Sequence, residues 1–273
     1  MSTTERTDEA LAQEVLAERR GAVKWIWFNR PQVKNALTTD VADLMREEIE
    51  KAPGEGARVI VISGKGGAFC SGADLKAASS KMSEGENVSV HDILAYHYHP
   101  LVLAMTGSPL PVIAAIDGAS AGIGCDIALA ADMRLISDRA FFSEIFVNIA
   151  LMPDGGGSFT LSRLVGSGRA LEMAMTGCRV AADKAEAWGL ANYVYPASEF
   201  EAKVQEFAAA LSEKAPLSIA QSKAAIRANL EGVSFKDALQ REAVEQQKLA
   251  ETEDFPEGVM AFLQKRKANF QGK

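Results

Sequence analysis

The stretch PVIAAIDGASAGIGCDIALAAD, residues 111–132, decides the fold of this chain. Its first part, residues 112–117, is short and apolar, as is typical of a strand that is covered on both faces. A tight turn follows, and a helix is predicted from near Gly122 to about Ala131. A helix start leaves backbone N–H groups free, and Asp126 lies one turn inside. Free amides beside a carboxylate can stabilise an oxyanion and move a proton, so this stretch is the first candidate site.

Length and composition limit the class of protein. The 273 residues are enough for one large α/β domain or for a domain with a helical appendage. No apolar run of 18 residues is present, which argues against a membrane span. The formal net charge of -7 argues against nucleic acid as the main partner. The polar, acidic first residues do not resemble a targeting peptide, so the expected location is the cytoplasm.

The remaining pattern predicts strands that alternate with helices and then a helical tail. The expected strands are 15–18 and 23–28 (a hairpin), 59–63, 112–117, 133–136, 140–143 and 191–195. The expected helices are 39–52, 91–105, 157–165, 169–175, 182–188, 199–213, 216–230, 235–250 and 255–267. Residues 77–90 lack periodicity and are predicted to form a mobile loop, a candidate lid. This order is typical of βαβ units with right-handed crossovers.

Two tempting motifs fail on spacing. The glycine-rich turn at 64–69 lacks the spacing of a phosphate-binding loop, and Ile127 stands where a dinucleotide fingerprint needs its third glycine. His97 and His99 are two residues apart on a predicted helix and therefore point to different faces. The three cysteines are far apart and form no CxxC pair. Neither a metal site nor a disulfide framework is expected.

Three carboxylates lie in apolar or glycine-rich surroundings: Asp126, Glu144 and Asp154. Asp154 precedes three glycines and a helix, so capping of that helix is its structural alternative. Asp126 stands among Ile and Ala residues, where burial without a purpose would be costly. Glu144 is expected at a solvated strand position. From the residues alone, the chain is an α/β protein with candidate acid–base carboxylates.

At these residues the chain resembles the crotonase superfamily, the enoyl-CoA hydratases and isomerases, from about residue 15 to residue 273. The matching segments are residues 29–37 (NRPQVKNAL), 68–75 (AFCSGADL), 111–126, 153–157 (PDGGG) and 261–266 (AFLQKR). The resemblance implies an α/β crotonase (ClpP-like) spiral of ββα units with a helical C-terminal region. It divides the chain into a disordered N-terminus (1–14), a spiral core (15–200) and a helical trimerisation region (201–273). The expected assembly is a homotrimer or a hexamer made of two trimers.

The resemblance also implies an acyl-CoA thioester as substrate, with no cofactor and no metal. The N–H groups of Ala73 and Ile123 match the two donors that hold a thioester enolate oxygen. Ile123 stands where the family usually has Gly, and its side chain would narrow the pocket. The implied substrate-binding residues are Val33, Lys34, Ala36, Asp74 and Leu75 along CoA, Gly122, Phe146 and Pro153, and Phe262 and Lys265, which would reach the CoA of a neighbouring subunit.

Departures from the hydratase pattern favour isomerisation. The two glutamates of the hydratase pattern correspond here to Asp126 and Phe146, whereas Asp154 matches the catalytic aspartate of isomerases. The closest resemblance is to the ring-opening isomerases of phenylacetyl-CoA catabolism. We therefore expect an acyl-CoA isomerase with Asp154 as the main acid–base and Asp126 as a second proton carrier or water-holder. Glu144, two residues before Phe146 and expected on the same side of a strand, is kept as a secondary alternative for the missing glutamate.

Three alternatives to the isomerase stay open at this point. One is an enoyl-CoA hydratase that uses Asp126. The others are a non-catalytic CoA-binding relative and an RNA-binding relative, which the net charge of -7 disfavours.

Overall fold

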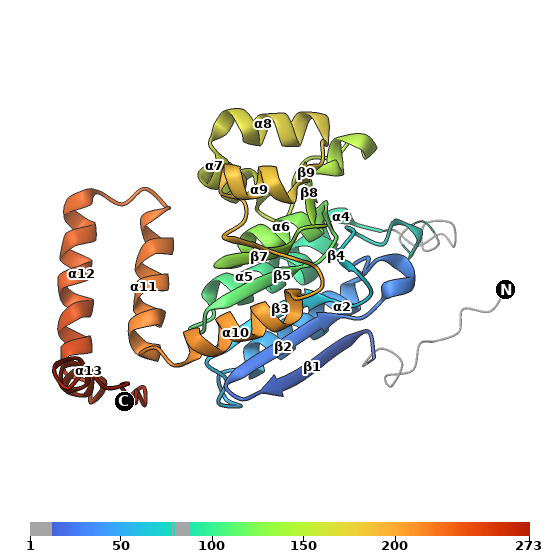
Figure 1. Ribbon diagram of the computed structural model, residues 1–273. Coiled ribbons are helices and arrows are strands. Elements are labelled where there is room, and N and C mark those ends of the chain that lie inside the picture. The colour runs from blue at the N-terminus through green and yellow to red at the C-terminus, as the bar shows by residue number, and fades with distance from the viewer. Residues whose placement is uncertain (1–12, 78, 80–87) are drawn as a thin grey trace.

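The computed structural model describes residues 13–77, 79 and 88–273. Its core is a spiral in which the chain passes from a larger sheet to a smaller one and then into a helix (Figure 1). The strand order is β1-β2-β3-β5-β7-β10 in the larger sheet and β4-β6-β8-β9 in the smaller. The predicted α/β fold with a helical C-terminal region is confirmed.

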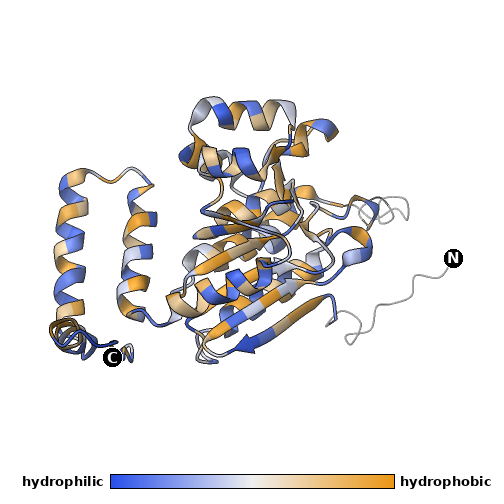
Figure 2. Cartoon of the chain, viewed as in Figure 1, coloured by the Kyte–Doolittle hydropathy of each residue, from blue (hydrophilic) through white to orange (hydrophobic). Residues whose placement is uncertain are grey.

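The strands of the larger sheet lie at the apolar runs of the sequence, as predicted. Its strands are β1 (Val15–Arg20), β2 (Val23–Phe28), β3 (Val59–Gly64), β5 (Val112–Ile116), β7 (Met133–Ser137) and β10 (Tyr193–Tyr195). β1 and β2 form the expected antiparallel hairpin, and the other neighbours are parallel. Every residue of β2 and of β5 is buried, and the strands are largely hydrophobic in Figure 2. Both faces of the sheet are therefore covered.

Alternation along the strands sends side chains to two separate cores. Val23, Trp25 and Trp27 share a cluster with α10 (Phe200–Ser212), which covers one face of the sheet. Ile26 and Phe28 point to the opposite core, which α2 (Thr39–Lys51), α5 (His99–Gly107) and α6 (Ile123–Ala130) fill. The Thr38 hydroxyl accepts from the Val41 N–H at 3.3 Å and caps α2 as expected.

The smaller sheet was only partly predicted. Its strands are β4 (Ala68–Cys70), β6 (Ala119–Ala121), β8 (Phe141–Ser143) and β9 (Val180–Ala181). The turn at Gly118 does not lead directly into a helix, because β6 lies between them. Gly118 has φ of +85°, and a Cβ there would lie 2.0 Å from the Gly67 carbonyl oxygen. Strands of two or three small residues are too short to show a period, which is why β6 and β9 were missed.

The remaining helices of the core are short. They are η1 (Pro31–Val33), α4 (Val90–Ile93), the π-helix η2 (Leu94–Tyr98), η3 (Ile145–Ile149), α7 (Gly157–Val165), α8 (Ser167–Thr176) and α9 (Ala182–Trp188). The helix expected over 91–105 is thus interrupted by a π-helical turn. The expected lid falls largely on residues 78 and 80–87, and the expected disordered N-terminus largely on 1–12. Both segments lie outside the described residues.

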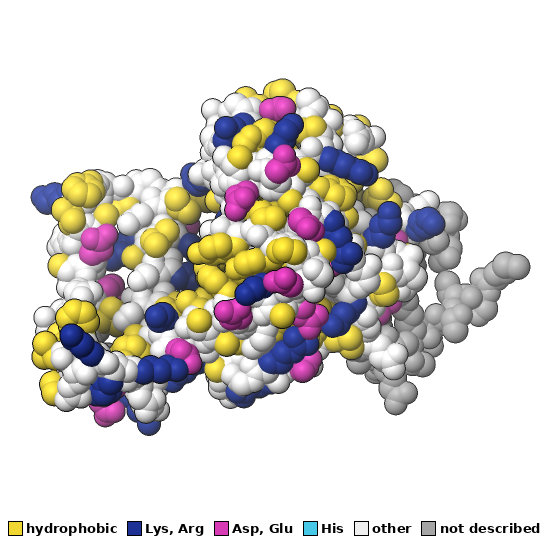
Figure 3. All heavy atoms as spheres, in the orientation of Figure 1, with side chains coloured by type: hydrophobic (Ala, Val, Ile, Leu, Met, Phe, Trp, Pro, Cys, Tyr) yellow, Lys and Arg dark blue, Asp and Glu magenta, His cyan; other side chains and the backbone are white. Residues whose placement is uncertain are grey.

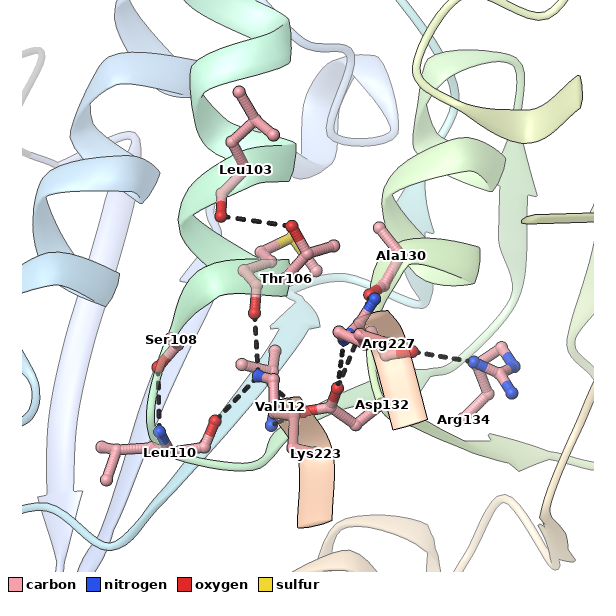
Figure 4. A network of polar contacts seen from close by, with 12 residues as sticks. Leu103, Thr106, Ser108, Leu110, Val112, Ala130, Asp132, Arg134, Lys223 and Arg227 are labelled. Carbon is pink, nitrogen blue, oxygen red and sulfur yellow. Dashed lines mark hydrogen bonds and ion pairs between the residues drawn. The ribbon is translucent and has the colours of Figure 1, made fainter. Parts of the chain in front are cut away.

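Helices α11 (Pro216–Asn229), α12 (Phe235–Ala250) and α13 (Asp254–Leu263) form an arm beside the core (Figure 1). Asp132, just after α6, anchors it: its carboxylate pairs with Lys223 at 2.8 Å and Arg227 at 2.7 Å (Figure 4). Lys223 also donates to two backbone carbonyls, those of Met105 and Leu110. No residue of α11 or α12 is buried. The expected boundary at residue 200 stays a prediction, and by its contacts α10 packs with the sheet.

No helix among the described residues is long and apolar enough to span a membrane.

Candidate active site

The turn that carries Asp154 is tied to helix α6 by a carboxylate. Asp126 Oδ2 accepts hydrogen bonds from the Gly155 N–H at 2.7 Å and the Asp154 N–H at 3.2 Å. The glycines permit this approach. A Cβ on Gly157 would lie 1.9 Å from Asp126 Oδ1, and one on Gly155 would lie 2.7 Å from Asp126 Cβ. The turn 153–157 therefore needs glycine at 155 and 157, because a larger residue at either position would collide with the buried Asp126 side chain.

Asp154 has an unpaired carboxylate oxygen. The residue is half-buried, and its Oδ1 is enclosed without a hydrogen-bond partner among the described residues. Burial raises the pKa of Asp154 to about 6, while the nearby His99 opposes the shift. Its backbone carbonyl accepts from His99 Nε2 at 2.8 Å. Helix α7 begins after Gly156 with no side-chain cap, so the capping role does not apply. The carboxylate is free to accept a proton.

Asp126 is enclosed completely. It has no exposed surface, and burial raises the pKa of Asp126, with the Gly155 amide opposing the shift and the charge of Asp154 adding to it. Oδ2 accepts from the two amides of the turn, and Oδ1 receives no hydrogen bond from an N–H or hydroxyl group of the described residues. In this geometry Asp126 braces the turn of Asp154. Its expected role as a second proton carrier or water-holder stays a prediction.

The expected solvent exposure of Glu144 was wrong. Glu144 has no exposed surface, and the strand ends before it, because β8 stops at Ser143 and η3 begins at Ile145. The alternation that placed it on the side of Phe146 therefore does not apply. Burial raises the pKa of Glu144, and the neighbouring Asp126 charge adds to the shift. Sequence reasoning expected solvent here because most glutamates are exposed.

The Ala73 N–H is left free by the way its segment pairs. A parallel bridge joins Leu37 and Ala73 through the Leu37 N–H to the Gly72 carbonyl and the Asp74 N–H to the Leu37 carbonyl, at 2.8 and 2.9 Å. Both bonds skip the Ala73 N–H, and Ala73 is exposed. The Tyr98 hydroxyl donates to the same Leu37 carbonyl at 3.1 Å.

Ile123 is the first residue of α6, so its N–H has no partner within the helix. It follows Gly122, which has φ of +53°, and a Cβ on Gly122 would lie 3.7 Å from Gly72 Cα. Since Gly72 precedes Ala73, the two candidate amides follow glycines whose backbones touch. The Ile123 side chain is buried and packs against Gly155, as a Cβ there would lie 2.4 Å from Ile123 Cδ1. Phe146 is buried beside Gly122.

The loop with Val33, Lys34 and Ala36 runs along the segment 71–74. The Ser71 N–H donates to the Lys34 carbonyl at 3.1 Å, and Lys34 and Asn35 have φ of 53° and 58°. Lys34 and Leu75 are exposed, whereas Val33, Ala36 and Asp74 are half-buried. The structure thus gathers these five residues into one surface next to Ala73.

Two buried polar residues hold this loop, and sequence reasoning gave them no role. Arg30 pairs with Asp74 at 2.9 Å and Glu14 at 3.2 Å. The Asn35 side chain donates to the carbonyls of Lys65 and Ala68 and accepts from the Arg30 N–H at 2.8 Å. The sequence feature that could have pointed to them is an Arg and an Asn on either side of a proline turn. Turns without a functional role show the same pattern.

Two expected residues lie elsewhere in the chain. Phe262 lies in α13 and Lys265 follows its end, both in the arm, and Figure 1 shows α13 away from α7, the helix that follows the turn of Asp154. The Phe262 side chain is 83% exposed. Within the described residues, no group of three His, Cys, Asp or Glu side chains could hold a metal ion.

The arrangement defines a class of site: two free amides at facing glycine turns, with a half-buried carboxylate on the turn that packs against one of them. The sequence pattern of the enoyl-CoA hydratase/isomerase family matches residues 18–273. The chain therefore belongs to the enoyl-CoA hydratase/isomerase family, within the crotonase superfamily.

Individual relatives are similar over nearly the whole chain. A Rhodobacter capsulatus protein named "probable enoyl-CoA hydratase" is 38% identical, with 91% of this chain and 94% of that protein covered. The trans-2-decenoyl-[acyl-carrier-protein] isomerase of Streptococcus mutans is 32% identical, with 96% and 99% covered. The crystal structure of an enoyl-CoA hydratase from Bacillus anthracis has a TM-score of 0.89 at 30% identity, with 96% and 100% covered.

Proposed function

We propose that this chain is an acyl-CoA isomerase that shifts a C=C bond by moving a proton next to the thioester. The observation that carries the proposal is Asp154, whose unpaired Oδ1 and pKa of about 6 suit a group that accepts and returns a proton near neutral pH. The position of the second hydratase glutamate holds Phe146, which is buried and cannot move a proton. A single carboxylate suffices for isomerisation.

The proposed reaction uses the amides and Asp154 in turn. Asp154 takes a proton from carbon, and the electron pair moves through the conjugated system onto the thioester oxygen. The N–H groups of Ala73 and Ile123 stabilise that oxygen, and loss of one such donor typically costs about 10²–10³ in rate. Asp154 then returns the proton to a different carbon, and the C=C bond has moved.

Substrate contacts follow from the same surface. Val33, Lys34, Ala36, Asp74 and Leu75 are proposed to line CoA. Gly122, Phe146 and Pro153 are proposed to border the acyl group. Phe262 and Lys265, in the arm, are proposed to reach the CoA of a neighbour in a homotrimer or in a hexamer of two trimers.

A subgroup and a location are also proposed. The motifs at 99–102 and at 153–157, with Phe146, support a relationship to the ring-opening isomerases of phenylacetyl-CoA catabolism. A cytoplasmic location is proposed from the similarity to bacterial relatives such as the Rhodobacter capsulatus protein.

Hydration of a 2-enoyl-CoA is the second candidate function. It is favoured by the hydratase name of the Rhodobacter capsulatus relative and by the presence of Asp126 beside Asp154. Hydration needs a positioned water and a proton for the α-carbon, work that two carboxylates usually share.

The test offers 3-enoyl-CoA and 2-enoyl-CoA esters to the unaltered chain, Asp154→Asn and Asp126→Asn. We expect the unaltered chain to interconvert the two esters and Asp154→Asn to lose about 10²–10⁴ in kcat. Full isomerase activity in Asp154→Asn would refute the assignment. Net addition of water without isomerisation would establish the hydratase, and CoA binding without turnover would establish a non-catalytic relative.

A further inference from the structure

Glu144 is a buried carboxyl group that the proposed reaction does not use. It has no exposed surface, and no N–H or hydroxyl group of the described residues donates to either of its oxygens. An ionised carboxylate in such surroundings is very costly, because the group has no exposed surface and the Cys125 thiol, a weak donor, is the group that opposes the rise of its pKa. Glu144 is therefore either protonated and neutral in the folded chain, or its charge strongly destabilises the folded chain.

The groups that face Glu144 indicate the neutral form. They are the Cys125 thiol and the Asp126 carboxyl from α6, with Asp154 on the turn beyond them. None of these is a cation, and His99 from α5 faces Asp154. Burial raises the pKa of Cys125 well above its usual range, so the thiol stays neutral. Burial also raises the pKa of Glu144.

Asp126 offers the matching acceptor. Its Oδ2 holds the amides of Asp154 and Gly155, while its buried Oδ1 has no donor from an N–H or hydroxyl group of the described residues. A neutral carboxylic acid carries one O–H, which can donate to a carboxylate. Hydrogen bonds between an acid and a carboxylate are short and strong.

We propose that Glu144 is a positioning residue: as a neutral acid it donates a hydrogen bond to the Asp126 carboxylate, which in turn holds the turn of Asp154. The inference rests on the proposed function in one respect, that Asp154 is the proton carrier. The order of contacts is Glu144 to Asp126, Asp126 to the amides of 154 and 155, and this turn to the reacting carboxylate. In this role Glu144 and Asp126 give no proton to the substrate.

The role of Glu144 is to keep Asp126 charged inside a buried site. With donors on both of its oxygens, Asp126 stays ionised, and an ionised carboxylate accepts from the two turn amides more strongly than a protonated one does. Without Glu144, Asp126 binds a proton at a higher pH, the amide bonds weaken, and Asp154 loses its fixed position.

The first experiment needs no activity. Infrared difference spectra between the unaltered chain and Glu144→Gln are recorded at pH 7 without substrate. We expect the unaltered chain to show the C=O stretch of a protonated carboxylic acid that Glu144→Gln lacks. A difference that contains only carboxylate bands would show that Glu144 is ionised and would overturn the proposal, whatever reaction the chain catalyses.

The second experiment distinguishes the hydrogen bond that Glu144 donates from the space that its side chain fills. Glu144→Gln keeps an N–H donor toward Asp126, whereas Glu144→Leu removes the donor at similar size. We expect Glu144→Gln to keep the pH profile of kcat for isomerisation. In Glu144→Leu the acid limb should move up by about one pH unit, as expected for the loss of one hydrogen bond to a charged acceptor.

An unchanged profile in folded Glu144→Leu would contradict the proposal, and so would a Glu144→Gln that behaves like Glu144→Leu. If Glu144→Leu does not fold, the infrared spectrum and the Glu144→Gln profile decide. Absence of turnover in the unaltered chain would refute the proposed function alone, because the infrared result stands without it.

Discussion

At the residue scale, the site depends on how closely Asp126 approaches the turn of Asp154. Three glycines follow Asp154, and two of them face the Asp126 side chain at distances that leave no room for a methyl group. The third, Gly156, has φ of +94°, which other residues rarely adopt. One buried carboxylate thus explains a glycine run that would otherwise resemble a generic loop.

Gly157→Ala tests this approach. The added methyl group would lie 1.9 Å from Asp126 Oδ1, so the turn or α6 must shift. We expect a loss of about 1–3 kcal/mol in the free energy of unfolding, measured in urea, and a lower kcat. The matched control is Gly168→Ala in α8, where no atom lies within 4 Å of the new Cβ and helix propensity favours Ala. Equal stability of the two variants would contradict the contact.

The pH dependence of turnover tests Asp154 itself. The base must be ionised in the free enzyme, and burial raises the pKa of Asp154 to about 6 from its usual value near 4. Because protonation removes the base, kcat/KM for isomerisation should fall as the pH decreases through about 6. Stopped-flow or steady-state rates between pH 4.5 and about 8 check this. A plateau that extends down to about pH 4.5 would show that the base is not this buried carboxylate.

At the element scale, the π-helix η2 orients two side chains toward the site. Tyr98 ends the π-helical turn and is buried, with its hydroxyl on the Leu37 carbonyl, and His99 follows with Nε2 on the Asp154 carbonyl. The Leu37 carbonyl also accepts the Asp74 N–H, so Tyr98 supports the bridge that leaves the Ala73 amide free. π-Helical turns are frequent at functional sites.

Tyr98→Phe removes only the hydroxyl. We expect a loss of about 1 kcal/mol in stability and a drop in kcat with little change in KM, since the Ala73 donor acts on the enolate. Tyr96→Phe is the control, because Tyr96 lies in the same π-helix and is 68% exposed. Steady-state kinetics and urea unfolding of both variants give the comparison. A kcat that is unchanged in Tyr98→Phe would exclude a role for the hydroxyl in holding the amide.

Long periodic elements were predictable from the sequence, and short or irregular ones were not. β3, β5, α2 and α12 carry a clear apolar period and were placed to within one or two residues. The π-helix and β6 were missed, because their conformations depend on packing rather than on local preference. In the site, the free amides at the start of α6 followed from the helix pattern, and the assignment of Ala73 and Ile123 as the two donors followed from a resemblance. The burial of Glu144 depends on how α6 and η3 meet, which no local pattern encodes.

At the scale of the whole molecule, the arm of α11–α13 is held by charges rather than by a buried apolar face. Asp132, Lys223 and Arg227 form the contact drawn in Figure 4, and the side chain of Lys223 is only 8% exposed. Loss of one partner from a buried pair leaves the other charge uncompensated.

Asp132→Asn should therefore destabilise the chain by about 3 kcal/mol, at the lower end of the range for a buried pair because Arg227 is partly solvated. The control is Glu50→Gln, which removes an exposed pair with Arg46 and should cost less than about 1 kcal/mol. Urea unfolding at fixed protein concentration measures both. Equal costs would show that the Asp132 contact does not hold the arm.

The arm also exposes several large apolar side chains. Phe235, Phe262 and Leu263 are 79%, 83% and 68% exposed, and Figure 3 shows apolar side chains on the surface of these helices. Exposed apolar patches of this kind mark association surfaces. We therefore expect light scattering to give three times the 29.2 kDa of one chain, or six times for two trimers. Phe235→Asp should lower that mass, whereas Lys236→Asp at the adjacent exposed position should not. A single-chain mass for the unaltered protein would leave Phe262 and Lys265 without a neighbouring site to reach, and would refute their proposed contact with CoA.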